Sequence, residues 1–256
     1  MADTENQRTY ATRRIVRHYA ALRELQPAEQ TIFNLLRDRL PKMQMLDIGV
    51  GGGRTTLHFA PAVASYIGID SSAKMIAACR QRFADRVFEC GDARAMPQFA
   101  DNSFDFVLFS FNGLDYMPHA DRLRVLQEVR RICRPGGYFC FSSHNLQAME
   151  QMFCWKNQLS RNPLTTYSNL VMLLLLRGLN RSISPRRLKA ADHAVIRDES
   201  HNFRLQTYYV RPQVQIQQLA AFQTSWIYSW QSGLEITDSA DASPDLWLYY
   251  LCTIAA

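Results

Sequence analysis

The sequence predicts an α/β protein built on a doubly wound, mostly parallel sheet. Three observations lead to this fold class. Between residues 43 and 143, short apolar segments alternate with stretches that have helical spacing. A run rich in glycine follows the first apolar segment, where ligands bind in such sheets. The chain has 256 residues, 47% of them hydrophobic, which is enough for one large domain or for one domain with a sizeable insertion.

The first part of the chain predicts a helical cap over residues 1–42. Apolar residues recur at helical spacing through residues 8–40. Pro27 interrupts this pattern and Pro41 ends it, because proline cannot continue a helix from its interior.

The alternating pattern of the sheet begins after this cap. The sequence predicts buried strands at 43–49, 65–70, 87–92, 104–111 and 134–143. It predicts intervening helices at 54–62, 72–84 and 122–133.

The alternation stops after residue 143. The stretch 144–206 is longer than a crossover needs, so we expect a helical lid insertion that contributes to the acceptor site. The core, 43–143, then resumes over 207–256. A helix is expected from Pro212, followed by two aromatic-rich strands at 224–233 and 246–254, which could pair as an antiparallel hairpin.

The insertion carries most of the charge imbalance. Nine basic and three acidic residues fall between 151 and 205, and this difference of six equals the net charge of +6 of the whole chain. Such a surface suits nucleic acid, anionic lipid or an acidic substrate, although a solvated basic face is at least as common. The apolar run 170–179 is too short to span a membrane and suits the core of a lid, a homodimer contact or, less commonly, an acceptor pocket.

Other classes of protein are disfavoured by composition. The six cysteines are scattered without a C-x-x-C pair, so neither a zinc site nor a disulfide framework is expected. The polar N-terminus lacks the apolar segment of a signal peptide. We therefore expect a soluble, cytoplasmic protein with no membrane span and no bound metal.

The glycine run "LDIGVGGGRTT" (46–56) does not match a dinucleotide or phosphate loop. A dinucleotide loop that started at Gly49 would need its third glycine at position 54, where the chain has Arg54. A phosphate loop would need a lysine before a serine or threonine at its end. The pattern that fits is D-x-G-x-G-x-G, formed by Asp47, Gly49, Gly51 and Gly53.

This pattern resembles motif I of the class I S-adenosylmethionine-dependent methyltransferases. Later motifs are similar in order and distance: "GIDSSAKMI", "CGDARAMP", "NSFDFVLFSFNGLDYM" and "RPGGYFCFS". The resemblance implies strand order 3-2-1-4-5-7-6 with an antiparallel seventh strand, and S-adenosylmethionine as cofactor. The cofactor-binding positions it implies are Asp47, Gly49, Gly51, Gly53, Asp70, Ser71, Met75, Asp92, Ala93, Phe109 and Ser110. Asp70 would bind both ribose hydroxyls, and Asp92 with the backbone of Ala93 would meet the adenine.

The resemblance also implies a reaction, in-line methyl transfer to a small-molecule acceptor that leaves S-adenosylhomocysteine. An RNA or protein methyltransferase, a non-catalytic module that binds the cofactor, and a nicotinamide oxidoreductase remain alternatives. Tyr19 could close over the methionine end of the donor. Base candidates are His144 after the fifth strand, and His201, Tyr208 or Tyr209 if the insertion folds back over the acceptor. Asp115 is isolated, which disfavours a cation-dependent enzyme.

Overall fold

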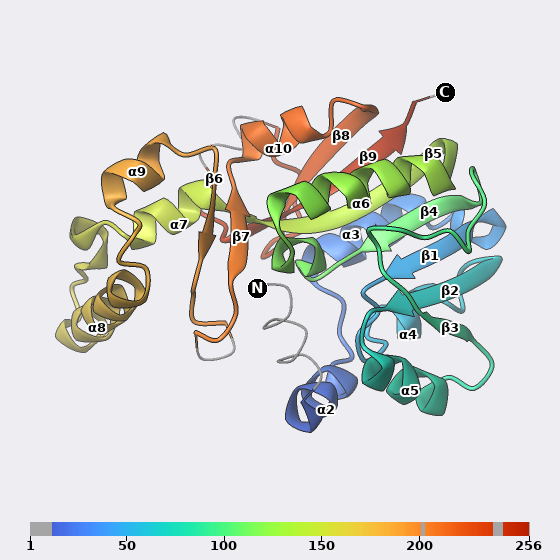
Figure 1. Ribbon diagram of the computed structural model, residues 1–256, viewed down its shortest axis with the longest axis horizontal. Helices are drawn as coiled ribbons and strands as arrows, with labels where there is room; N and C mark the ends of the chain where they lie inside the picture. Colours follow the sequence, from blue (N-terminus) through green and yellow to red (C-terminus); the bar gives the residue numbers. More distant parts are fainter. Residues whose placement is uncertain (1–11, 201–202, 238–242, 256) are drawn as a thin grey trace.

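A twisted sheet forms the centre of the computed structural model, which describes residues 12–200, 203–237 and 243–255 (Figure 1). Its strands are β1 (Gln44–Ile48), β2 (Ser65–Asp70), β3 (Val87–Cys90), β4 (Phe104–Phe109), β5 (Cys133–Asn145), β8 (Phe222–Ser229) and β9 (Trp247–Ile254). Strands β3, β2, β1, β4 and β5 are neighbours in this order and parallel. Strand β9 runs antiparallel to β5, and β8 pairs with β9. The predicted order is therefore confirmed, with β8 and β9 as the sixth and seventh core strands.

A second hairpin, which the sequence pattern did not indicate, lies at the far end of β5. It consists of β6 (His193–Ile196) and β7 (Thr207–Val210), which pair antiparallel. Strand β7 continues the sheet by pairing with the last two residues of β5, His144 and Asn145. Each of these strands has four residues, too few for an alternating pattern to stand out.

Helices cover both faces of the core sheet. On one face, α6 (His119–Ile132) buries apolar side chains with those of β4, β5 and β9, and Leu219, just after α10 (Pro212–Gln218), joins them. On the other, α3 (Pro27–Leu36) contacts β8 and β9, α5 (Ala73–Arg82) contacts β2 and β3, and α4 (Thr56–Phe59) places Phe59 against Phe106 of β4. A short 3-10 turn, η1 (Leu40–Lys42), joins α3 to the first strand.

The helix after the glycine loop is shorter than expected. The sequence predicted residues 54–62, whereas α4 covers only Thr56–Phe59. Ala60 still has helical dihedral angles, but Pro61 has no N–H to donate to the carbonyl four residues earlier, so the helix does not continue through it. The five residues before α4 form turns, so the glycine loop is longer than the pattern indicated.

The insertion is mainly helical and extends from one end of the sheet, at the left of Figure 1. It contains α7 (Leu146–Met152), η3 (Trp155–Gln158), α8 (Pro163–Leu179) and α9 (Pro185–Ala190). These elements bury a small apolar core of their own, which includes Phe153, Leu176 and Leu188. Among the described residues, no helix combines the length and the hydropathy that crossing a membrane requires.

Candidate functional site

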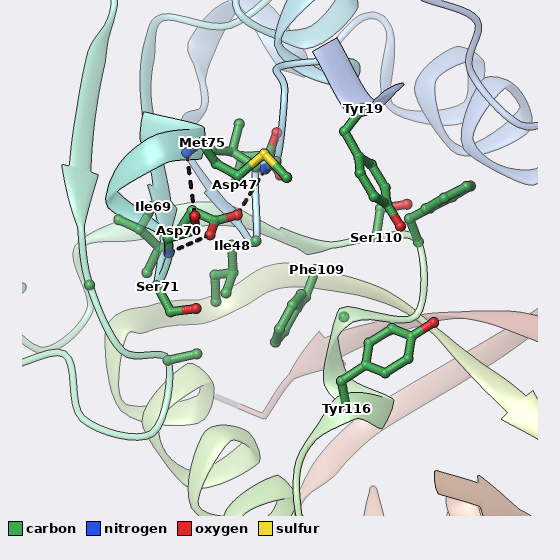
Figure 2. Close-up of a pocket in the computed structure, with 18 of the residues that line it drawn as sticks. Tyr19, Asp47, Ile48, Ile69, Asp70, Ser71, Met75, Phe109, Ser110 and Tyr116 are labelled. Atoms are coloured by element: carbon green, nitrogen blue, oxygen red, sulfur yellow. Dashed lines mark hydrogen bonds between the residues drawn. The ribbon is translucent and has the colours of Figure 1, made fainter. Parts of the chain in front are cut away.

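A cavity of about 550 Å³ opens where β1, β2 and β4 end, beside the glycine loop (Figure 2). Eleven of the twelve expected cofactor-binding residues line it: Tyr19, Asp47, Gly49, Gly51, Asp70, Ser71, Met75, Asp92, Ala93, Phe109 and Ser110. The volume lies in the range of pockets that enclose a drug-sized molecule. The carboxyl edge of the sheet thus gathers residues from four separate motifs around one ligand-sized space.

The glycine loop brings backbone, rather than side chains, to the cavity. Gly49 has a φ of +65°, and a Cβ there would lie 2.8 Å from the ring of Phe109. Gly51 has a φ of +55° and points its N–H at Asp70. Only glycine adopts this sequence of left-handed turns without strain. Gly53 is not among the lining residues, because its α-carbon faces the ring of Phe83 instead.

Asp70, at the end of β2, presents its carboxylate to the cavity. One oxygen accepts the Gly51 N–H at 3.0 Å and the other accepts the Ser72 N–H at 2.7 Å (Figure 2). Burial raises the pKa of Asp70, and the two N–H groups lower it only in part. Each oxygen keeps acceptor capacity, so the carboxylate can bind two neighbouring hydroxyl groups at once.

Asp92 lies on the wall after β3 and is engaged by a neighbour that the sequence analysis did not single out. Arg94 binds both oxygens of Asp92 and also pairs with Asp121 on α6 at 2.9 Å. The hydrogen bonds from Arg94 lower the pKa of Asp92. This carboxylate is therefore held ionised and oriented at the rim of the cavity.

Asp47, at the end of β1, is almost fully buried. Its Oδ2 accepts hydrogen bonds from Thr55 at 2.5 Å and from Tyr66 at 2.7 Å. Burial raises the pKa of Asp47 to about 6, against the opposing effect of the two hydroxyls. The residue therefore holds the glycine loop onto the strand while its own charge is poorly solvated.

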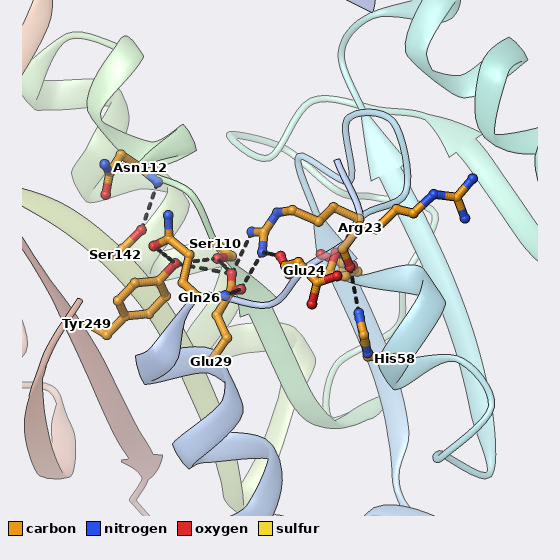
Figure 3. A network of polar contacts seen from close by, with 12 residues as sticks. Arg23, Glu24, Gln26, Glu29, His58, Ser110, Asn112, Ser142 and Tyr249 are labelled. Carbon is orange, nitrogen blue, oxygen red and sulfur yellow. Dashed lines mark hydrogen bonds and ion pairs between the residues drawn. The ribbon is translucent and has the colours of Figure 1, made fainter. Parts of the chain in front are cut away.

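A buried ion pair joins the N-terminal cap to this loop. Arg54 binds both carboxylate oxygens of Glu29, which lies on α3 (Figure 3). Glu29 also accepts hydrogen bonds from Ser110 and from Tyr249. Burial alone would lower the pKa of Arg54, but the bonds and charge of Glu29 outweigh it and raise that pKa. The guanidinium lies 4.9 Å from the ring of Phe111, another lining residue.

In the sequence, Arg54 served only to exclude a dinucleotide loop, and the ion-pair partner of this side chain was not predicted. A charged residue between a glycine run and an apolar helix was the available signal. It could indicate burial with a counter-charge, but nothing in the local pattern pointed to Glu29, 25 residues earlier.

Helix α2 (Arg13–Ala21) brings Tyr19 to the cavity. A Cβ at Gly52 would lie 2.4 Å from the backbone nitrogen of Ala20, so helix and loop are in direct backbone contact. The Tyr19 ring meets the Phe111 ring edge-on, with centroids 6.1 Å apart. Tyr19 thus lies on the same side of the cavity as Ser110, as Figure 2 shows.

The 3-10 turn η2 (Gly113–Tyr116) closes the wall opposite Asp70 and adds apolar surface. Phe111, Tyr116 and Met117 line the cavity there, beyond Phe109. Phe111 has a φ of +58°, a left-handed conformation that turns the chain sharply after β4. An apolar, aromatic partner molecule could bind against this wall.

The candidate bases lie away from the lining. His144 is buried behind η2, with its Nδ1 2.7 Å from Asp115 and its ring centroid 6.4 Å from that of Tyr116. Tyr208 is buried, its hydroxyl 2.7 Å from Nδ1 of His119, and burial raises its pKa. Neither lines the cavity. Tyr209 is also buried and bonds Asp198. His201 lies outside the described residues.

The charges on the cavity wall balance. Asp47, Asp70 and Asp92 oppose Arg54, Lys74 and Arg94, three against three. Two of the cations are also bound by carboxylates behind the wall, Glu29 and Asp121. The wall therefore offers little excess positive charge to a polyphosphate and suits a ligand that is zwitterionic or cationic. Among the described residues no three His, Cys, Asp or Glu side chains gather as they would around a metal ion.

None of the lining residues comes from 144–206. The described part of the insertion thus leaves this cavity uncovered, and its closure over an acceptor remains a prediction.

Comparison with known proteins identifies the core. Residues 45–137 match a protein family described as a methyltransferase domain. Over 144 residues the chain is 35% identical to a phthiotriol/phenolphthiotriol dimycocerosates methyltransferase of Mycobacterium tuberculosis. This aligned stretch covers 54% of this chain and 51% of that protein. Over 98 residues it is 37% identical to a demethylmenaquinone methyltransferase of Renibacterium salmoninarum, 38% of this chain and 40% of that one. The chain thus matches about half, or less, of the length of these relatives.

A solved structure extends the likeness in fold over almost the whole chain. The 1,6-didemethyltoxoflavin-N1-methyltransferase of Burkholderia thailandensis superposes with a TM-score of 0.57, covering 99% of this chain and 87% of that one. The two sequences are 15% identical, so this match shows a shared fold.

Proposed function

We propose that this chain is a class I S-adenosylmethionine-dependent methyltransferase and transfers a methyl group from S-adenosylmethionine to a small-molecule acceptor, which the match of residues 45–137 to a methyltransferase domain supports. The observation that carries the proposal is the carboxylate of Asp70, placed by two backbone N–H groups at the wall of a ligand-sized cavity. A carboxylate held in this way suits the two ribose hydroxyls of a nucleoside.

The charges of the cavity support this donor over a dinucleotide. S-adenosylmethionine carries a sulfonium and an ammonium against one carboxylate, whereas a dinucleotide carries a pyrophosphate. The wall has equal numbers of acidic and basic groups, and two of the basic groups are already paired with carboxylates. Such a wall favours S-adenosylmethionine over a dinucleotide. When bound, the donor would supply an electrophilic methyl group that needs no metal and no oxyanion site.

The residues of the chain would contribute mainly position. Asp70 and Asp92 would hold the nucleoside, while Phe109, Ser110 and Tyr19 would border the amino-acid end. Fixing donor and acceptor in line can supply about 7–11 kcal/mol of the barrier in favourable systems. Because charge disperses as the methyl group moves, an apolar wall suits this reaction.

The acceptor would bind against the wall formed by Phe111, Tyr116 and Met117. These side chains offer aromatic and thioether surface and favour a molecule of low polarity. The named substrates of the two relatives above, a phthiotriol lipid and a demethylated menaquinone, fit that description for those proteins. A small apolar or aromatic acceptor is therefore the class that we propose here.

His144 is our proposal for the group that takes a proton from the acceptor. Asp115 binds its Nδ1, so Nε2, which lies 3.4 Å from the side-chain amide nitrogen of Asn112, would be the nitrogen that accepts the proton. Because Tyr116 lies between His144 and the cavity, the acceptor would have to displace this side chain. His144→Asn should lower kcat, with affinity for S-adenosylhomocysteine unchanged. A loss of that affinity would instead indicate a structural role.

Calorimetric titration tests the donor. S-adenosylmethionine and S-adenosylhomocysteine should bind the purified chain, and NAD should not. Asp70→Ala should weaken S-adenosylhomocysteine at least about 100-fold, since two charge-assisted hydrogen bonds are lost. Asp38→Ala, an exposed carboxylate on another part of the surface, serves as control. Binding of NAD alone, or an unchanged affinity in Asp70→Ala, would refute the proposal.

A further inference from the structure

Helix α8 carries a stripe of exposed apolar side chains along its outer side. Its members are Leu164 (78% exposed), Tyr167 (70%), Val171 (38%), Leu174 (70%), Leu175 (45%) and Leu179 (47%). With 100° per residue these positions fall within an arc of about 140°, and they extend for about 22 Å along the axis. These six side chains form one continuous apolar strip along the helix.

The inner side of α8 already supplies what the fold needs. Leu173 and Leu176 are buried and lie opposite the stripe, and Leu176 packs in the core of the insertion with Phe153 and Leu188. A surface helix ordinarily turns polar residues outward. This helix is apolar on two opposite sides, and only one of them contributes to a core of the chain.

The segment that carries the stripe is basic, and its nearest acidic residues in sequence are Glu150 and Asp192, just outside it. Between 151 and 191 the chain has seven basic residues and no aspartate or glutamate: Lys156, Arg161, Arg177, Arg181, Arg186, Arg187 and Lys189. All seven are exposed, and Arg177, which lies away from the stripe on α8, also donates a hydrogen bond to the Phe153 carbonyl. They lie on η3, α8 and α9 and the turns between them, which form the far left end of the molecule in Figure 1.

Two further exposed side chains extend the apolar surface beside α8. Trp155 (53% exposed) and Leu159 (58%) lie in and just after η3, the 3-10 turn that contacts α8. Tryptophan and tyrosine are enriched where hydrocarbon meets water, since each has an apolar body and a polar group. Trp155 and Tyr167 are the two aromatic residues of this surface.

A second copy of the chain does not suit this surface. A two-fold contact through α8 would bring two segments of charge +7 together. The stripe, about 22 Å by about 10 Å, offers roughly 200 Å², well under the ~800 Å² per partner of a stable interface. RNA is also disfavoured, because five of the six stripe residues are aliphatic and offer no ring on which a base can stack.

We propose that α8, with Trp155, Leu159 and the seven basic residues of 151–191, docks the protein on an anionic lipid bilayer. The helix would lie in the plane of the interface, with the stripe among the acyl chains and the cations against the headgroups. An in-plane helix needs an apolar face together with basic residues, which this surface combines. The proposal concerns a surface distinct from the cavity, so it stands or falls independently of the methyl-transfer proposal.

Vesicle sedimentation tests the docking. The full chain is mixed with vesicles of phosphatidylcholine alone, or with about 30% phosphatidylglycerol, and the bound fraction is measured. Binding should be at least about tenfold stronger to the anionic vesicles and should weaken when salt rises from about 0.05 M to about 0.5 M. With brominated acyl chains, tryptophan fluorescence should be quenched in the native chain and much less in Trp155→Phe.

Matched variants distinguish binding through the α8 surface from non-specific adsorption to vesicles. Leu164→Asn with Leu174→Asn should lower the partition coefficient at least about tenfold. Leu35→Asn with Leu234→Asn changes two leucines of the core that are also mostly exposed (58% and 70%), and should leave the partition coefficient unchanged. Arg181→Gln with Arg186→Gln should weaken binding to anionic vesicles and leave binding to phosphatidylcholine vesicles unchanged. The control pair Arg37→Gln with Arg130→Gln, on the core, should leave binding to both kinds of vesicle unchanged. All variants should keep the thermal midpoint of the native chain, because the altered side chains are exposed.

Three results would overturn the proposal. The first is no binding to anionic vesicles at low salt. The second is binding that the α8 leucine pair leaves unchanged. The third is a dimer in solution that this leucine pair dissolves, which would assign the stripe to a second copy.

Discussion

The core and the insertion differ in where their charged and apolar side chains lie: the core buries many of them, whereas the insertion exposes many of them. In the core, two arginines are buried against carboxylates, Arg54 with Glu29 and Arg122 with Asp115. In the insertion, seven cations lie exposed along 151–191, where the chain has no acidic residue. The core buries most of its leucines, with Leu35 and Leu234 as exposed exceptions, whereas the single helix α8 exposes four.

This contrast indicates where each region finds its partners. The polar groups of the core are satisfied by other parts of the same chain, mostly distant in sequence. The outer surface of the insertion is complementary to nothing else that the structure describes. Substitutions should therefore change stability in the core, and change interactions with other molecules in the insertion.

The largest effect on stability should come from the ion pair beneath the cavity. Arg54→Met leaves the carboxylate of Glu29 buried without its counter-charge, and breaking such a pair costs about 3–5 kcal/mol. Urea unfolding of the purified chain measures this loss. Arg130→Met, an exposed arginine on α6, should change the free energy of unfolding by less than about 0.5 kcal/mol. A loss under about 1 kcal/mol in Arg54→Met would contradict the buried pair.

Asp47 should make the stability of the core depend on pH. Its pKa is raised from 3.8 to about 6, so the folded chain binds this proton more tightly than the unfolded chain does. The contribution of this residue is complete below about pH 4 and falls as the pH rises through about 6, by about 3 kcal/mol in total. Asp47→Asn should remove this dependence in urea titrations at pH 4, 6 and 8. An identical pH profile in the variant would refute the assignment.

Gly52 tests the contact between the cap and the core. Gly52→Ala places a Cβ 2.4 Å from the backbone of α2, so helix and loop must separate. A loss of about 2 kcal/mol is expected, together with weaker binding of S-adenosylhomocysteine because Tyr19 moves away. Thermal denaturation and calorimetry measure the two effects. Unchanged binding would mean that Tyr19 does not contact this ligand.

The smallest effect should come from the glycine in α8, and its sign should be opposite. A Cβ at Gly178 meets nothing within 4 Å, so Gly178→Ala removes only the conformational cost of glycine in a helix. The variant should be more stable by about 0.5–1 kcal/mol, with ligand binding unchanged. A destabilised variant would show that this face of α8 is packed rather than exposed.

The sequence predicted the parts of the fold that depend on local pattern. Apolar segments separated by helices indicated the five parallel strands, and the terminal aromatic segments indicated the hairpin β8–β9. Asp70 was placed correctly at the edge of the sheet, because a residue that ends a parallel strand next to the first one must lie there.

Other features could not be read from local pattern. Glu29 and Arg54 meet only because α3 packs against the glycine loop, a tertiary contact that no spacing encodes. The run 170–179 was interpreted as a lid core or dimer contact, since composition alone cannot tell which side of a helix is buried. The strands β6 and β7 were missed because residues 197–206 separate two very short segments.

The pairing of β5 with β9 also has a consequence for how the chain folds as it is synthesised. Phe139 on β5 pairs with Cys252 on β9, across more than a hundred residues that include the whole insertion. Until β9 leaves the ribosome, one edge of β5 has no partner and the apolar helix α8 has already emerged. Contacts of such long range form slowly, and an open strand edge invites association with other chains. We therefore expect the nascent protein to need protection by a chaperone, or early contact with the surface that α8 binds.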